Sequence, residues 1–296
     1  MDEAVSTTGS PPEQHASTRI HGLDALRGVL MMLGIVLHVG LAYQWPEWAF
    51  LDWTVQADKM SFVSDSIHMF RMPAFFFLSG FFGGLLWERR GARAMLKNRV
   101  ARIVLPFFAF ILIVTPLDMF ANHFGRHIKA QGESPLQYAL NVFLHVPFPH
   151  NTIHLWFLYH LIYVTGFTVL LVYWLKRLGW TWPGFISMVR RVMESPWLFA
   201  GVLGGINFLW CGVFEWGHIP TDVEWIPRTP EIIVYYFGWY GLGWVLFVSR
   251  AAMERFHHGA WTFVGVGAVA TALRNEDVLR SLGIPISPEE GGMMWW

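Results

Sequence analysis

Long apolar stretches alternate with short polar connections along most of this chain. A window of about 19 residues finds apolar stretches near 23–43, 67–87, 103–121, 153–175, 197–214, 231–249 and, with a weaker signal, 260–273. A helix of about 20 apolar residues crosses a bilayer and satisfies its own backbone hydrogen bonds. The pattern therefore predicts an all-α, polytopic integral membrane bundle of about six to eight transmembrane helices.

We expect one membrane domain with a tail at each end. Residues 1–19 are polar and contain no apolar core flanked by a cleavage site. They are predicted to be a disordered cytoplasmic tail, so that the first span serves as an uncleaved anchor. The membrane domain is expected over 20–273, and the polar, irregular tail 274–296 does not continue the pattern of spans.

Positive charges gather in every second connection between the spans. Connections 88–102, 176–191 and 250–255 hold twelve Lys and Arg residues, whereas the intervening connections hold four. By the positive-inside rule the twelve face the cytoplasm, which also places the N-terminus inside. The charge pattern thus predicts a multi-pass membrane protein with a cytoplasmic N-terminus.

The composition fits a membrane protein and narrows the range of functions. Hydrophobic residues make up 54% of the chain and charged residues 14%, about half the charged fraction of a soluble domain. Lys plus Arg equals Asp plus Glu at 21 each, so we expect membrane lipids rather than nucleic acid as a partner. The single cysteine, Cys211, excludes a disulfide framework within one chain.

The first span carries the strongest candidate for chemistry, an arginine and a histidine. Arg27 and His38 are eleven residues apart and share one helix face with Asp24. Ionisable groups inside a membrane are costly and usually functional. This face would combine a fixed cation with a titratable proton acceptor. The alternative is an interhelical hydrogen bond beside an arginine that extends to the membrane surface.

A second polar group begins the second span. His68 and Arg71 lie one turn apart, and Ser79 follows His68 by eleven residues on nearly the same face. Pro73 between them frees backbone groups that are tolerated only where they face a cavity or protein. A structural polar anchor at the outer interface is the alternative.

A third candidate is the pair of arginines before the third span. Arg99 and Arg102 lie one turn apart, and guanidinium groups bind phosphates through two parallel hydrogen bonds. The pair is predicted to hold a phosphorylated cofactor at the cytoplasmic surface. The alternative is that the cluster only sets topology and contacts anionic lipid headgroups.

The long outer connection is rich in histidine. Two pairs have the i, i+4 spacing seen at metal sites, but no neighbouring carboxylate completes a metalloprotease-like arrangement. We therefore expect no metal. The histidines on or near this connection are His123, His127, His145, His150, His154 and His160.

These motifs, in this order, resemble the bacterial membrane acyltransferase-3 family. The resemblance rests on Arg27-x10-His38 after the run 22–26, on the Phe-Arg-Met-Pro-rich run 70–81, on Arg99-x-x-Arg102 and on the His-Leu-Trp-Phe-Leu run 154–158. The amino-acid sequences of runs 70–73 and 156–161 resemble in particular the branch that contains the succinyltransferase of periplasmic glucans. The resemblance covers about residues 19–250.

The family resemblance implies transfer of an acetyl or succinyl group from cytoplasmic acyl-coenzyme A to a hydroxyl of an extracytoplasmic envelope carbohydrate. His38 would be the general base or a covalent acyl relay, and Arg27 would bind donor phosphates or the developing oxyanion. Acyl-coenzyme A is then the co-substrate, and the protein lies in the bacterial inner membrane. Arg99, Arg102 and Arg71 would bind the donor, and Asp24, His68, Ser79 and His154 would line the substrate cavity.

Two alternatives to an active enzyme stay open. A transporter would use Arg27 and His38 as a proton or substrate relay, although the sequence has no inverted repeat. An inactive fragment is the other, because the family usually has about ten spans and the residues after about 272 do not resemble further helices. The acyl group, the acceptor and the oligomeric state are left open by the sequence.

Overall fold

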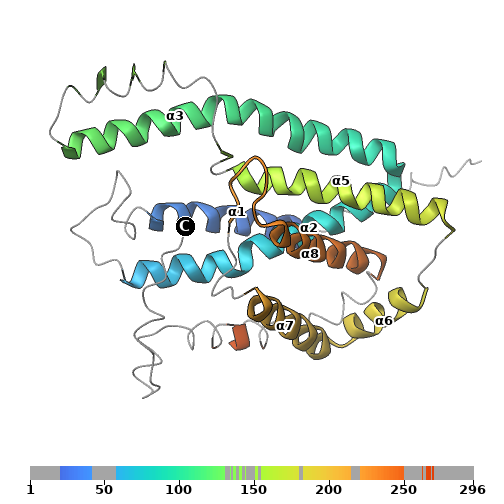
Figure 1. Ribbon diagram of the computed structural model, residues 1–296. Coiled ribbons are helices and arrows are strands. Elements are labelled where there is room, and N and C mark those ends of the chain that lie inside the picture. The colour runs from blue at the N-terminus through green and yellow to red at the C-terminus, as the bar shows by residue number, and fades with distance from the viewer. Residues whose placement is uncertain are drawn as a thin grey trace, which may run out of the picture.

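In a computed structural model of the chain, the regular elements of the described part are all helices (Figure 1). They are α1 (His21–Leu41), α2 (Asp58–Arg99), the π-helix η1 (Val100–Val104), α3 (Leu105–Ala130), α5 (Trp156–Arg177), α6 (Pro183–Glu194), α7 (Pro196–Val213) and α8 (Pro230–Val248). The all-α prediction is confirmed. The structure describes residues 21–41, 58–130, 134, 136–137, 140–141, 144, 151–152, 155–179, 183–214, 221–249, 262, 265–267 and 269.

The first six predicted spans all coincide with long apolar helices. Five helical segments are long and apolar enough to cross a membrane. One of them, Ser66–Ala121, has 56 residues and would be about 84 Å long if straight, almost three times the hydrocarbon thickness of a bilayer. It contains two predicted spans. The two predicted tails, and all of the span 260–273 except residues 262, 265–267 and 269, lie outside the described residues.

A glycine corner divides this long segment into two antiparallel arms. Gly91 has φ 78° and ψ 171°, a backbone conformation that favours glycine, and the chain reverses between α2 and α3 at the right-hand end of Figure 1. The returning helix therefore starts directly after Gly91. Arg99 and Arg102, expected in a surface connection, instead lie eight and eleven residues along this helix, about 12 and 16 Å from the corner.

We call the two ends of the bundle the basic end and the loop end. The basic end holds Gly91 with the exposed Arg89 and Arg90, and the loop end holds residues 221–229 before α8. α2 up to its corner, α5 and α8 run from the loop end to the basic end, and α1 runs the opposite way (Figure 1).

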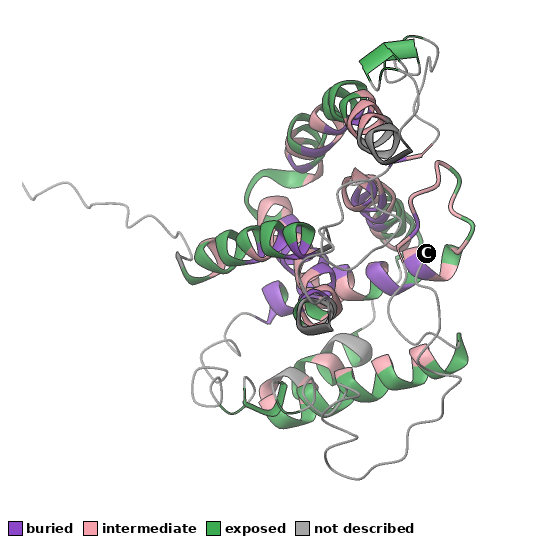
Figure 2. Cartoon of the chain, turned by 90° about the vertical axis from the view of Figure 1, so that its left-hand side faces the viewer, coloured by how far each residue is buried: buried purple, intermediate pink, exposed green. Residues whose placement is uncertain are grey.

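The centre of the bundle is the contact between α2 and α8, which run parallel. Phe76 stacks on Tyr236 with ring centroids 4.3 Å apart, and one turn later Gly80 meets the backbone carbonyl of Tyr240. A Cβ atom on Gly80 would lie 1.9 Å from that oxygen, so only glycine permits this approach. Buried residues gather at this centre and exposed residues cover the outside (Figure 2).

α1 packs against the outgoing arm of α2. Its buried positions are Leu30, Gly34, Leu37 and Gly40, and this spacing of three to four residues is typical of helix pairs that run almost side by side. α7, in contrast, has no buried residue, as expected of a helix that contacts lipid.

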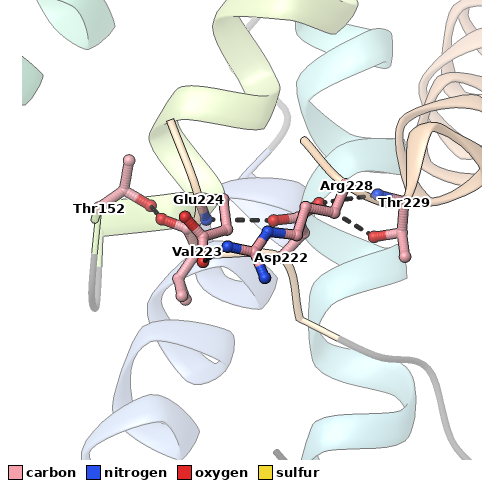
Figure 3. A network of polar contacts seen from close by, with 6 residues as sticks. All are labelled: Thr152, Asp222, Val223, Glu224, Arg228 and Thr229. Carbon is pink, nitrogen blue, oxygen red and sulfur yellow. Dashed lines mark hydrogen bonds and ion pairs between the residues drawn. The ribbon is translucent and has the colours of Figure 1, made fainter. Parts of the chain in front are cut away.

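The loop end is closed by a network around one buried carboxylate (Figure 3). Asp222 accepts hydrogen bonds from the Glu224 amide at 3.1 Å and from the Thr229 amide and hydroxyl at 3.2 and 2.9 Å. The amide and hydroxyl of Thr152 donate to the Val223 carbonyl at 2.7 and 2.8 Å. Because Thr152 precedes α5 and Thr229 precedes α8, the network ties the starts of these two helices together.

Candidate functional site

Arg27 and His38 lie on a flank of α1 rather than in its buried stripe. The Arg27 guanidinium is 3.8 Å from the Asp24 carboxylate and 5.1 Å from the Phe82 ring centroid, and its side chain is 54% exposed. His38 is also exposed, as is Met31 between the two. Such an exposed ion pair contributes little to stability. The roles predicted for both residues stay predictions.

Arg71 reaches from α2 to the same region of α1. Its Nη2 lies 2.8 Å from the place where a Cβ of Gly34 would stand, and its Cζ lies 5.8 Å from the Phe75 ring centroid. Gly34 is one turn before His38, so Arg71 contacts the turn of α1 next to the one that carries the histidine. The structure thus brings together two segments that are 33 or more residues apart in sequence.

The buried Nε of Arg71 has no hydrogen-bond partner among the described residues. A buried polar group without a partner costs about 1–3 kcal/mol, and more if it is charged. Arg71 is therefore suited to receive an anionic or carbonyl oxygen. His68, one turn earlier on α2, is half-buried and lies nearer the loop end.

Arg99 and Ser79, two further predicted residues, contact each other directly. The Arg99 Nη1 donates to the Ser79 hydroxyl at 3.0 Å, and Nη2 donates to the Ser79 backbone carbonyl at 2.7 Å. Arg102 is exposed, although Arg99 is half-buried. The π-helix that begins at Val100 changes the helical repeat between them, and such local distortions are frequent at functional sites.

A row of buried polar side chains continues from Arg99 between α5 and α8, and its two tyrosines and one threonine are absent from the sequence-based prediction. A Cβ on Gly83 would lie 2.5 Å from the Tyr240 hydroxyl and 3.2 Å from the Arg99 Nη2. Thr165 of α5 lies beside the Tyr240 hydroxyl. One turn along α8, Tyr236 meets His160 with ring centroids 6.4 Å apart. We call Arg99, Thr165, Tyr240, Tyr236 and His160 the buried polar row.

In the described part of the chain, several polar atoms of this row make no hydrogen bond of good geometry, although Thr165 and Arg99 lie beside the Tyr240 hydroxyl. The hydroxyls of Thr165, Tyr236 and Tyr240 make no hydrogen bond of good geometry to the described residues. The His160 Nδ1 lies 2.9 Å from the Trp156 carbonyl oxygen, to which it can only donate. In the neutral ring, Nε2 is therefore an acceptor, and this fully buried atom also lacks a partner.

The sequence offered one signal for this row. His160 stands in the apolar span 153–175, and an ionisable group inside a membrane span is a functional candidate by default. Its nearness to the histidines of the outer connection hides this signal. His154, the remaining predicted cavity residue, lies outside the described residues. Among the described residues, no group of three His, Cys, Asp or Glu side chains could hold a metal ion.

Comparison with known proteins identifies relatives of this chain. It is 30% identical over 182 residues to proteins named glucans biosynthesis protein C from Salmonella paratyphi B, Salmonella enteritidis and Salmonella dublin. The match covers 58% of this chain and 44% of each relative, so the chain spans less than half of their length. No solved structure matches the chain.

The family comparison covers most of the chain. Residues 20–273 match the family described as acyltransferase domain, and the Arg27, Arg71, Arg99 and Ser79 contacts described above all fall within this region. The chain, a multi-pass membrane protein, therefore belongs to the acyltransferase-3 family.

Proposed function

We propose that this protein is a membrane O-acyltransferase that moves an acetyl or succinyl group from cytoplasmic acyl-coenzyme A to a hydroxyl of an extracytoplasmic carbohydrate. Family membership supports the reaction class, and the printed name of the relatives supports a glucan as acceptor. The basic end faces the cytoplasm of the bacterial inner membrane in this proposal, in line with the distribution of Lys and Arg.

The observation that carries the proposal is the approach of Arg71 to α1 beside the turn that holds His38. A guanidinium with a free Nε, against the turn of α1 next to the one that carries an imidazole, offers an oxyanion binder near a proton acceptor. Acyl transfer to a hydroxyl requires both groups, because the carbonyl oxygen gains charge while the hydroxyl loses its proton.

The proposed step conserves atoms and charge. His38 takes the proton of the acceptor hydroxyl while the hydroxyl oxygen attacks the acyl carbon of the thioester. The carbon–sulfur bond then breaks, and the coenzyme A thiolate leaves and takes the proton from His38, which returns the imidazole to its neutral form. In the relay variant, the His38 nitrogen attacks the thioester carbon and displaces the coenzyme A thiolate. The acceptor hydroxyl then attacks the acyl-imidazole, the carbon–nitrogen bond breaks, and the hydroxyl proton passes to the thiolate through solvent. Arg27, nearer the basic end, would bind the donor.

The experiment uses purified full-length protein in lipid nanodiscs with radiolabelled acetyl- or succinyl-coenzyme A and a glucan acceptor. We expect covalent label on the glucan from the wild type and a loss of at least about a hundredfold in His38→Ala, the usual range for removing a general base. Met31→Ala, on the same exposed face, is the matched control and should stay active. Full activity of His38→Ala would remove this residue from the mechanism.

A further inference from the structure

The two seams that α8 makes with its neighbours differ in character. Along α2, glycines bring backbones into contact, and a Cβ on Gly243 would lie 1.8 Å from the Phe77 carbonyl oxygen. Along α5, at least four polar atoms of the buried polar row make no hydrogen bond of good geometry to described residues, and of these atoms only the hydroxyls of Tyr240 and Thr165 lie beside one another. Each such atom costs about 1–3 kcal/mol while the seam is closed. The α5–α8 seam is thus the one that a polar ligand can open at the lowest cost.

The α5–α8 seam is held by hydrogen bonds near the loop end and has few buried residues near the basic end. Near the loop end, Thr152 bonds to the Val223 carbonyl, and the Tyr159 hydroxyl donates to the Trp225 carbonyl (Figure 3 shows the first). In the last three turns of α5, Thr168 is the one buried residue. The exposed Lys176 ammonium lies 5.3 Å from the Trp87 ring centroid, a contact of about 0.5–1 kcal/mol. Opening therefore starts from the basic end.

The depth of Arg99 separates it from the cations at the corner. Arg90 and Arg93 are exposed at the basic end, next to Gly91. Arg99 lies about 12 Å farther along the returning helix, and both of its Nη atoms already bind Ser79. A nucleotide phosphate at the membrane surface would meet the corner arginines before it met Arg99. A deeper and less charged part of the ligand would meet the row.

We propose that the α5–α8 seam receives the pantetheine arm of the acyl donor, which enters from the basic end and parts α5 from α8. This inference rests on the proposed function. The arm is a neutral chain with two amides and a hydroxyl, and the row contains no carboxylate to repel or misdirect it. The hydroxyls of Tyr236, Tyr240 and Thr165 donate to its amide carbonyls, and the His160 Nε2 accepts from an amide N–H.

The spacing of the row suits an extended arm. Thr165 and His160 lie eleven and sixteen residues before Lys176 on α5, about 16 and 24 Å from the basic end. Tyr240 and Tyr236 follow the same direction on α8, one turn apart. Successive amides of the arm therefore meet successive polar side chains.

The test measures separately how the arm and the nucleotide of the donor bind to full-length protein in nanodiscs. The probes are acetyl-coenzyme A, S-acetylpantetheine, which lacks the nucleotide, and adenosine 3′,5′-bisphosphate, which lacks the arm. We expect Tyr236→Phe to weaken the first two about 3- to 10-fold and to leave the third unchanged, as loss of one hydrogen bond predicts. Arg90→Gln should weaken the bisphosphate and leave S-acetylpantetheine unchanged.

Two controls distinguish ligand binding from structural support. Tyr235→Phe removes a neighbouring hydroxyl that is satisfied by the Asn207 amide oxygen at 2.6 Å, and it should not alter any of the three affinities. His160→Asn keeps a donor for the Trp156 carbonyl but loses the Nε2 acceptor, so it should weaken S-acetylpantetheine about as much as Tyr236→Phe. Thermal stability of Tyr236→Phe should not fall, because the lost hydroxyl has no protein partner.

Failure of the seam assignment and failure of the proposed function give different experimental results. S-acetylpantetheine binding that is unchanged in both Tyr236→Phe and His160→Asn would overturn the assignment of the seam. Transfer of label to glucan is measured on the same preparations. A wild type that binds the donors with the expected pattern but never modifies glucan would retain the seam and reject the proposed function.

Discussion

Replacing Gly80 by alanine should separate α2 from α8, and this tests the packing that positions every candidate residue. The added Cβ would lie 1.9 Å from the Tyr240 carbonyl oxygen, 2.7 Å from its carbon and 3.1 Å from its Cα. All three are backbone atoms, so no side-chain rotation relieves the overlap. The helices must move apart by about 1 Å or more to restore ordinary contact distances.

The expected destabilisation follows from two opposed terms. A gap of 0.5–1 Å already removes about a quarter to a half of the attractive energy of each dispersion contact along the α2–α8 interface. Overpacking a core lowers the stability of a protein by about 1–3 kcal/mol or more. Alanine regains about 1 kcal/mol of helix propensity over glycine. Because the overlap is with backbone atoms, the overpacking loss lies at the upper end of its range, and about 3 less about 1 leaves a net loss of about 2 kcal/mol. The Phe76–Tyr236 stack should loosen as well.

The assay is thermal unfolding of purified protein, with Gly28→Ala as the matched control. Gly28 also lies in a membrane helix, but no atom lies within 4 Å of the place of its Cβ. Gly28→Ala should leave stability equal or slightly higher, whereas Gly80→Ala and Gly243→Ala should both lower it. Equal unfolding temperatures for Gly80→Ala and Gly28→Ala would refute the close α2–α8 approach.

Four further substitutions test individual contacts and the Gly91 corner. Asp222→Ala should loosen residues 221–229 and speed their proteolysis severalfold, because three hydrogen bonds to one buried carboxylate are lost; an unchanged cleavage rate would contradict this role. Ser79→Ala should cost about 1–3 kcal/mol by thermal unfolding, and Arg99→Lys should cost at least as much, because a lysine cannot bind the hydroxyl and the carbonyl as a fork. Gly91→Ala should cost about 1–2 kcal/mol through backbone strain alone, since its Cβ would meet nothing within 4 Å, and a neutral effect would argue against the corner.

The sequence predicted the membrane spans well because lipid imposes them. A segment that leaves water must be long, apolar and helical, so hydropathy alone identified six spans that fall in the five observed segments, two of them in Ser66–Ala121. The Gly91 corner was not predicted, because its neighbours are arginines and the charge pattern resembles an ordinary surface connection. For the same reason the inward position of Arg99 was missed, while its equally basic neighbours are exposed.

Contacts between residues of different helices were harder to predict from the sequence than the face of a single helix on which a residue lies. The period of α1 gave the shared face of Arg27 and His38, but it could not show that Arg71 approaches Gly34 from another helix. α8 is apolar on every side, so no periodicity distinguished the face of Tyr236 and Tyr240 from the face toward lipid. Only the α5–α8 contact shows that His160, Thr165 and the two tyrosines share one seam.

The most direct test of the central claim is transfer across a sealed membrane. Full-length protein is reconstituted into proteoliposomes, with glucan on one side and radiolabelled acyl-coenzyme A on the other. The account predicts covalent label on the glucan only when the donor is on the side of the basic end, and none in His38→Ala. Label that crosses the membrane without attaching to glucan, or equal modification by His38→Ala, would contradict it.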